Sequence, residues 1–387
     1  MRVLVTTPGG LGHVHPMIPL AEAVVARGHD LLWAVPGESL DHVERRRLPA
    51  VAAGGSGLSP AAAQRAYPEL LELAPAEVPE VMFAKLWGAM ATPTMLADLL
   101  PVALEWRPDL VVADGAEFAG HIVAAELGVA SVTKGFGALL PESRVAAAGE
   151  EVAPLWRSRG LEPRPYGGCY EYLYIDTYPP ELQPQTATHV PHRQLMRPVL
   201  EDERPGQSPP ALPDASDGPL VYLTMGTVFN EPQALRSVLD ALEKLSVRIL
   251  VTVGPWLDPA TVATSTPRVR LEPFVAQMLV LPHCDLVVSH AGSGTAMAAL
   301  ALGLPQLCLP RGADQFLNAG AVAAAGAGLS LGPEEATAEA VCDAATRLLE
   351  DPAYAEAARR VGASIASMPS PDDVVGVLES LSAQSLA

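Results

Sequence analysis

The sequence predicts an α/β protein made of two doubly wound, Rossmann-like domains that face a cleft. Short apolar runs rich in β-branched residues alternate with helical segments, which favours parallel sheets with helices on both faces. The pattern occurs twice, and each half opens with a strand that runs into a glycine-containing turn. Residues 201–219 lie between the halves and are dense in Pro, Gly, Ser and acidic residues, the composition of a linker. The chain has 387 residues, of which 49% are hydrophobic, so it is long enough for two such cores.

The first half begins with a buried strand at residues 2–6 and a turn that contains three glycines. A helix should follow and end near Gly28, a residue suited to a helix C-terminus. The further elements that we expect are a strand at 29–36, irregular helices over 55–105, a strand at 108–115 that ends at Asp114, a helix at 116–128 and a strand at 129–135.

The second half repeats the pattern after residue 219. We expect a strand at 220–227, a helix at 232–245, a strand at 247–254, a strand from 284 that enters a Gly-rich turn, a helix at 296–303 and a strand at 304–310. In such folds ligands bind beyond the carboxyl ends of the strands, at the switch point where the strand order reverses. The turns that follow the strands are therefore the first places to seek a site.

Charge and cysteine content argue against several classes of protein. The chain carries 25 Lys and Arg against 44 Asp and Glu, a net charge of −19, which disfavours nucleic acid and anionic membrane surfaces as partners. An anionic ligand would have to be held by local donors such as a helix N-terminus. The four cysteines form no CxxC pair, the N-terminal apolar run is too short for a signal peptide, and no run of about 18 apolar residues occurs. We therefore expect a cytoplasmic protein that binds no membrane.

Three common motifs fail. The turn at residues 9–13 would need a third glycine at position 15 to bind a dinucleotide, but His15 stands there, and no acidic residue ends the second strand. No GxxxxGK[ST] motif occurs, and Ala291 breaks a GxSxG nucleophile motif around Ser293. His13 and His15 have no third ligand nearby in sequence, so we expect no metal site.

The turn SHAGSGT at residues 289–295 has the chemistry of a diphosphate cradle. It ends a buried strand and opens an Ala-rich helix, whose N-terminal amides and dipole favour an anion. Two glycines allow close approach of a ligand, while two hydroxyl side chains and an imidazole add donors. The alternative interpretation is a tight turn with an N-cap Ser or Thr.

A second constellation involves His13 and Asp114. His13 follows the first strand and Asp114 ends the fourth, and these strands should flank the switch point of the first sheet. An aspartate bound to one imidazole nitrogen would fix the tautomer and leave the other nitrogen as a general base. The alternative is a turn histidine bound to backbone, with Asp114 as a helix N-cap.

On these residues the chain resembles the inverting glycosyltransferases of family 1 with the GT-B fold, specifically those that decorate bacterial natural products. The similarity covers nearly the whole chain and is most specific at residues 273–328. There a Phe-Val turn, a strand, HxGxGT, a helix, a short strand ending in Pro, DQ, Asn and a GAG turn follow in the family's order. The GGxGHxxP turn at 9–16 is similar to the family's acceptor-side signature.

The resemblance implies a metal-independent, inverting hexosyltransferase without a cofactor, since the nucleoside-diphosphate sugar is a substrate. His13 would deprotonate the acceptor and Asp114 would orient it; whether His15 shares the base role stays open. The implied donor-side residues are His290, Gly292, Ser293, Gly294 and Thr295 on the diphosphate, Gly226 and Thr227 near the phosphates, Asp314 and Gln315 on the sugar hydroxyls, and Phe274 and Val275 on the pyrimidine.

The resemblance also assigns the domains. Residues 1–200 would bind the acceptor, 201–219 would be the linker, and 220–368 would bind the nucleotide sugar. A helix at 369–387 would cross back onto the first domain. The acceptor pocket should be apolar, and the candidates for its lining are Phe83, Trp87 and Met90, although their helical spacing suits an ordinary core equally well.

Where plant members of the family carry a longer signature with Trp and Glu, this chain has only GADQ. That is similar to the bacterial branch that uses dTDP-deoxysugars, so we expect a dTDP-deoxysugar donor and a hydroxyl on an apolar aglycone as acceptor. The alternatives are a UDP-glucose-type glucosyltransferase, a C-glycosyltransferase, a sugar-nucleotide epimerase and a GT-B-like auxiliary partner that does not catalyse. Monomer and homodimer are both compatible with the sequence.

Overall fold

A computed structural model describes residues 1–73, 77–184, 187–200, 210–226, 232–254, 258–262 and 266–385. The chain divides into two compact units. Unit 1 comprises Met1–Thr177, Pro184–Pro198 and Met368–Ala387, and unit 2 comprises Tyr178–Gln183 and Val199–Ser367.

The described part of unit 1 contains a seven-stranded parallel sheet in the order β3-β2-β1-β4-β5-β6-β7. Its strand order reverses between β1 and β4, so the switch point lies between these two strands. The strands are β1 (Arg2–Thr6), β2 (Asp30–Val35), β3 (Ala50–Ala52), β4 (Leu110–Asp114), β5 (Ala130–Lys134), β6 (Leu173–Asp176) and β7 (Arg193–Leu195).

Helices surround this sheet, and the region expected to be irregular is built from several short ones. A π-helical stretch, η2 (Ala84–Ala91), joins two α-helices there. The helices of unit 1 are α1 (Leu11–Ala26), α2 (Gly37–Glu44), α3 (Pro60–Ala66), η1 (Pro68–Leu71), α4 (Val78–Phe83), α5 (Thr92–Trp106), α6 (Ala119–Leu127), α7 (Glu142–Ser158), η3 (Pro165–Gly168) and α13 (Pro371–Ser385).

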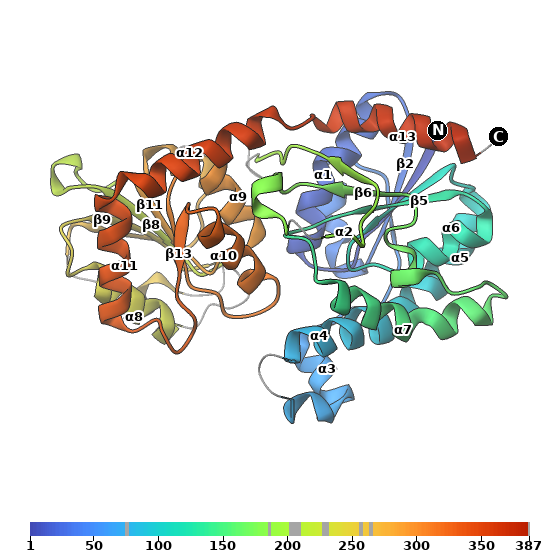
Figure 1. Cartoon of the computed structure of the whole chain (residues 1–387), viewed down its shortest axis with the longest axis horizontal. Coiled ribbons are helices and arrows are strands. Elements are labelled where there is room, and N and C mark those ends of the chain that lie inside the picture. Colours follow the sequence, from blue (N-terminus) through green and yellow to red (C-terminus); the bar gives the residue numbers. More distant parts are fainter. Residues whose placement is uncertain are drawn as a thin grey trace. The chain divides into compact units, whose positions relative to one another are not determined.

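Helix α13 packs beside α1 within unit 1 (Figure 1). Val374, Val375 and Leu378 on its inner face are each 0% exposed and belong to the apolar core that includes residues of α1, β1 and β4. At its start, Ser370 Oγ accepts from the Asp373 N–H at 3.2 Å and Asp373 Oδ2 accepts from the Ser370 N–H at 2.9 Å. This reciprocal cap satisfies donors that a helix start leaves without partners.

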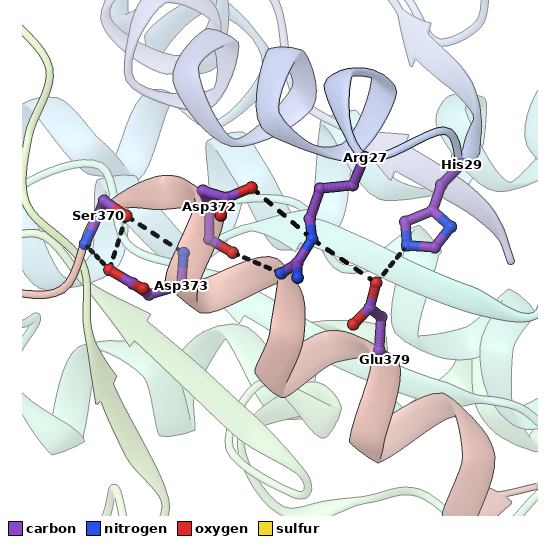
Figure 2. A network of polar contacts seen from close by, with 6 residues as sticks. All are labelled: Arg27, His29, Ser370, Asp372, Asp373 and Glu379. Atoms are coloured by element: carbon purple, nitrogen blue, oxygen red, sulfur yellow. Dashed lines mark hydrogen bonds and ion pairs between the residues drawn. The ribbon is translucent and has the colours of Figure 1, made fainter.

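Figure 2 shows polar contacts along the same helix. Arg27, which follows α1, donates from Nη1 to the carbonyl oxygen of Asp372 at 2.9 Å. His29 Nε2 lies 2.8 Å from Glu379 Oε1. These polar contacts help to orient α13, whereas its buried apolar side chains contribute most of the stabilisation.

Unit 2 contains, among its described residues, a six-stranded parallel sheet in the order β10-β9-β8-β11-β12-β13. Its strand order reverses between β8 and β11. The strands are β8 (Leu220–Thr224), β9 (Arg248–Thr252), β10 (Val269–Glu272), β11 (Leu286–Ser289), β12 (Gln306–Cys308) and β13 (Gly328–Ser330). The helices are η4 (Pro180–Leu182), η5 (Ala215–Asp217), α8 (Pro232–Leu242), η6 (Pro259–Val262), η7 (Gln277–Leu279), η8 (Leu281–His283), α9 (Ser293–Ala301), α10 (Gln315–Ala324), α11 (Ala338–Glu350) and α12 (Pro352–Ser367).

The expected architecture of two parallel, Rossmann-like sheets is confirmed, and every strand predicted by a long apolar run is present. The strands β3, β6, β7, β10 and β13 were not predicted. They have three or four residues each, and all but β3 include charged or polar residues or glycine, so no apolar run marks them. None of the described helices is long and apolar enough to cross a bilayer.

Two boundaries differ from the predicted domains. Residues 178–183 belong to unit 2, where η4 packs against α10, although they lie within the predicted first domain. Of the predicted linker 201–219, residues 201–209 lie outside the described residues, and residues 210–219 belong to unit 2.

Candidate active site

His13 and Asp114 lie together at the switch point of unit 1. His13 is in the first turn of α1, directly after β1, and Asp114 is the last residue of β4. These strands are hydrogen-bonded neighbours, with Thr6 opposite Ala113. His13 Nδ1 lies 2.9 Å from Asp114 Oδ1, and the Asp114 side chain is 1% exposed against 15% for His13. The aspartate therefore engages Nδ1, which assigns any base function to Nε2 of the same ring.

Asp114 does not cap the following helix. Its Oδ1 accepts a hydrogen bond from the Ala116 N–H at 2.9 Å, within the turn that follows β4. Glu117 instead binds the start of α6: its carboxylate accepts hydrogen bonds from the N–H groups of Ala119 at 2.6 Å and Gly120 at 2.9 Å. Asp114 is thus held by its own turn in a position that faces His13.

A buried cation lies in the strand next to Asp114. Lys134 is in register with Asp114 on β5, is 0% exposed and donates from Nζ to the carbonyl oxygen of Gly135 at 2.7 Å. Burial lowers the pKa of Lys134 to about 8, while the charges of Asp114 and Asp176 oppose that shift. Burial also raises the pKa of Glu117. Sequence reasoning missed both groups, because neither a lysine at the end of a strand nor a glutamate in the turn before a helix carries a local sign of its burial.

Two aromatic rings flank His13. The ring of Phe136 lies 4.6 Å from the imidazole and the ring of Trp87 lies 5.1 Å from it, centroid to centroid. Trp87 is in the π-helical stretch η2, a rare geometry found often at functional sites. The sequence indicated Trp87 as a pocket candidate but offered no signal for Phe136.

The other two pocket candidates pack within unit 1. Phe83 is 7% exposed, and its ring lies edge-on to Phe118 with centroids 6.3 Å apart. Met90 packs on a small apolar cluster around Leu70 and Leu86. Near Asp114, a narrow hollow is lined by Pro8, Pro36, Gly54, Gly55, Leu58, Ala91, Thr92, Met95, Ala116 and Glu117.

In unit 2, His290 lies at the corresponding switch point. It follows β11, and Gly226 follows the neighbouring strand β8. A Cβ at Gly226 would lie 2.5 Å from an imidazole carbon of His290, and a Cβ at Gly292 would lie 2.6 Å from Nε2. Only glycine therefore fits on either side of the ring. Burial lowers the pKa of His290 to about 4, so the ring is neutral at pH 7.

The turn after His290 leads into α9. Ala291 adopts a left-handed conformation with φ of 61°, a strained geometry for a residue with a Cβ. Helix α9 starts at Ser293. Like those of any helix, its first N–H groups have no intrahelical acceptors, and its N-cap residue, Gly292, has no side chain that could accept from them. An added Cβ at Gly294 would meet nothing within 4 Å, and Thr295 Oγ1 accepts from Gln277 Nε2 at 3.0 Å. Ser293, Gly294 and Thr295 thus form one helix N-terminus, as the cradle hypothesis requires.

Asp314 and Gln315 lie at the start of α10. Gln315 is 4% exposed, and its Oε1 accepts from the backbone N–H groups of Arg311 at 2.8 Å and Gly312 at 3.2 Å. Asp314 Oδ2 accepts from Asn318 Nδ2 at 2.9 Å. The oxygen of Gln315 thus orders the loop that presents Asp314.

Four further residues considered in the sequence analysis are Phe274, Val275, Thr227 and His15. Val275 is 7% exposed in an apolar cluster of unit 2, next to the half-buried Phe274. Thr227 lies outside the described residues. The ring of His15 lies 6.2 Å from that of His42. Within the described ranges, no group of three or more His, Cys, Asp or Glu side chains is arranged to hold a metal ion.

Two Rossmann-like sheets, each with a histidine at its switch point, fit the GT-B glycosyltransferase that the sequence resembles, and comparison with known proteins establishes this class. Residues 22–196 match the N-terminal domain, and residues 236–381 the C-terminal domain, of the erythromycin biosynthesis protein CIII-like family. The elloramycin glycosyltransferase of Streptomyces olivaceus is 33% identical over 98% of this chain and 97% of its own. The chain therefore belongs to this family of glycosyltransferases of natural-product biosynthesis.

Solved structures agree with this assignment. The glycosyltransferase SsfS6 of Streptomyces sp. SF2575, complexed with thymidine diphosphate, is 28% identical with a TM-score of 0.77, covering 98% of this chain and 99% of its own. The spinosyn rhamnosyltransferase SpnG, complexed with spinosyn aglycone, is 28% identical with a TM-score of 0.78. The match covers 98% of this chain and 100% of the SpnG chain.

Proposed function

We propose that this enzyme transfers a deoxysugar from a dTDP-sugar to a hydroxyl group of an apolar natural-product aglycone, with inversion at the anomeric carbon. The observation that carries the proposal is the contact between His13 Nδ1 and Asp114 Oδ1 at the switch point of unit 1. The thymidine diphosphate and the aglycone held by the related structures support the choice of donor and acceptor.

In the proposed reaction, His13 Nε2 takes the proton of the acceptor hydroxyl. The acceptor oxygen attacks the anomeric carbon from the face opposite the nucleotide, and the bond from that carbon to the diphosphate oxygen breaks. The electron pair of that bond leaves with the diphosphate, so the configuration inverts through an oxocarbenium-like transition state. Asp114 stabilises the imidazolium that His13 becomes, and the Trp87 and Phe136 rings offer an apolar surface for the aglycone.

The leaving diphosphate needs donors that do not depend on the net charge of the protein. The N–H groups at the start of α9, the Thr295 hydroxyl and the neutral His290 ring supply such donors in unit 2. They are ordered before the reaction, and preorganised donors of this kind stabilise developing negative charge. The proposed reaction therefore proceeds without a metal ion.

The test is calorimetric binding of dTDP and UDP in the presence of EDTA. We expect tight binding that prefers dTDP. A preference for UDP would overturn the choice of donor and indicate a glucosyl-type nucleotide sugar. Absence of binding for both nucleotides would overturn the diphosphate cradle.

A further inference from the structure

We propose that Tyr178 and Asn318 are positioning residues of the diphosphate cradle: Tyr178 orients the Ser293 hydroxyl, and Asn318 holds the backbone turn at Ala291. This inference rests on the proposed function of the turn as a diphosphate site. Tyr178 is absent from the sequence-based prediction of the site, and Asn318 enters it only as the Asn of the 273–328 signature, with no role assigned.

Tyr178 reaches the cradle from a distant part of the sequence. It opens the short segment Tyr178–Gln183, which belongs to unit 2 although the residues on both sides of it belong to unit 1. The side chain is 1% exposed. A phenol buried this deeply needs polar partners for its hydroxyl, and those partners lie at the N-terminus of α9 and on α10.

The Tyr178 hydroxyl lies 3.1 Å from Ser293 Oγ and 2.9 Å from Asn318 Oδ1. A phenol has one proton, so it donates to one of these oxygens at a time. When the proton goes to Ser293 Oγ, the serine oxygen is already an acceptor and its own proton is free to point outward. A phosphate oxygen in the cradle is the acceptor that such a proton requires, and chained hydrogen bonds strengthen one another.

Asn318 joins the two sides of the cradle. It is 1% exposed, and its Nδ2 donates to the carbonyl oxygen of Ala291 at 3.0 Å and to Asp314 Oδ2 at 2.9 Å. The left-handed backbone of Ala291 is a costly conformation that persists only where its surroundings hold it. One amide group therefore ties the strained turn before α9 to the acidic residue that precedes α10.

The first test compares two ligands on the variant Tyr178→Phe, which keeps the ring and removes the hydroxyl. We expect affinity for thymidine diphosphate to fall by about three- to tenfold, the worth of one hydrogen bond, while affinity for thymidine stays unchanged. Equal loss for both ligands would make Tyr178 merely structural, and no loss for the diphosphate would overturn the proposal. The control Tyr354→Phe removes a hydroxyl that accepts from Arg347 at 3.0 Å elsewhere in unit 2 and should leave both affinities unchanged.

A double-mutant cycle shows whether Tyr178 acts through Ser293. If it does, Tyr178→Phe combined with Ser293→Ala binds thymidine diphosphate no more weakly than Ser293→Ala alone. Additive losses would overturn the role through Ser293. For Asn318, Asn318→Leu removes the amide at similar volume without adding a charge that would itself repel the diphosphate. It should also weaken the diphosphate selectively, and loss of thymidine binding to the same extent would refute its role.

The wild-type protein separates failure of this inference from failure of the proposed function. If the wild type binds neither thymidine diphosphate nor uridine diphosphate, the proposed function fails and the inference with it. If the wild type binds thymidine diphosphate and the cycle is additive, the proposed function stands and the Tyr178 inference alone fails.

Discussion

Two histidines at the switch points of the two sheets have opposite surroundings. His13 is bound to the carboxylate of Asp114, which stabilises a protonated ring and suits a proton acceptor. His290 is enclosed by Gly226 and Gly292, and burial lowers its pKa to about 4. A neutral imidazole keeps one N–H group, so His290 can donate a hydrogen bond to a ligand while the ring itself stays uncharged. In the proposed reaction the same residue type therefore has two roles, as base toward the acceptor and as donor toward the diphosphate, because the neighbours of the two rings differ.

The proposed base role of His13 predicts a specific kinetic defect. His13→Ala should lower turnover by about 10²–10⁴, the usual contribution of a general base, and leave thymidine diphosphate affinity nearly unchanged. Thr295→Ala should do the reverse and weaken thymidine diphosphate binding by about three- to tenfold through loss of one donor. Single-turnover kinetics and calorimetry on both variants measure the two effects. A parallel loss of nucleotide binding in His13→Ala would show that His13 is structural.

The lowered pKa of His290 predicts acid sensitivity. Between pH 6.5 and about 4 the unfolded chain takes up a proton at this residue and the folded chain does not, so this group lowers stability as pH falls through that window. Above pH 6.5 it has no effect. His290→Gln should therefore lose less stability on acidification than the wild type, as measured by urea unfolding. His283→Gln removes an exposed histidine of the same unit and should behave as the wild type; identical slopes for all three proteins would contradict the prediction.

At the scale of elements, α13 shows which contacts hold a helix in place. Its inner face places three apolar side chains at 0% exposure, whereas the contacts of Figure 2 involve exposed groups such as Glu379, which is 40% exposed. Burial of a whole side chain is worth more than an ion pair in water, because water screens the charges and side-chain ordering opposes the pairing. The apolar face should therefore dominate the anchoring of α13.

This ranking predicts different costs for two adjacent substitutions. Leu378→Ala should destabilise the protein by about 2–5 kcal/mol, since it removes buried methyl groups and leaves a cavity. Glu379→Ala should cost at most about 1 kcal/mol. Urea unfolding of both variants measures the difference. Equal costs, or a larger cost for Glu379→Ala, would show that the polar network anchors the helix.

The elements also show which secondary structure a local sequence pattern can predict and which it cannot. Apolar strands such as β1, β4 and β11 follow directly from their composition, because burial on both faces of the sheet favours an apolar run. Short strands such as β7 and β13 arise because a neighbouring strand offers hydrogen bonds at the sheet edge, which no local pattern records. The π-helical stretch around Trp87 is decided by packing in the same way.

For the whole molecule, the dominant electrostatic fact is its net charge of −19, which has the same sign as the charge of the proposed nucleoside-diphosphate donor. Long-range repulsion should slow the encounter with a nucleoside diphosphate, while the local donors of the cradle hold it once bound. Raising the salt concentration screens the repulsion. The association rate of thymidine diphosphate should then rise, by up to about tenfold, between low and physiological salt. Stopped-flow binding measures this rate, and a fall with salt would mean that a local positive field governs association.

The sequence by itself determined the α/β class, the two-sheet organisation and the acidic surface. It also indicated His13, Asp114 and the turn at 289–295, because each of them lies at the end of an apolar strand or in the turn after it, and the local sequence shows both strand and turn. Only the tertiary structure revealed the rings of Trp87 and Phe136 against His13, the buried Lys134 beside Asp114, and Tyr178 beneath Ser293. Those contacts join residues separated by 20 to more than 100 positions in the chain. Their partners are selected by strand order and packing, and no local pattern of residues carries that information.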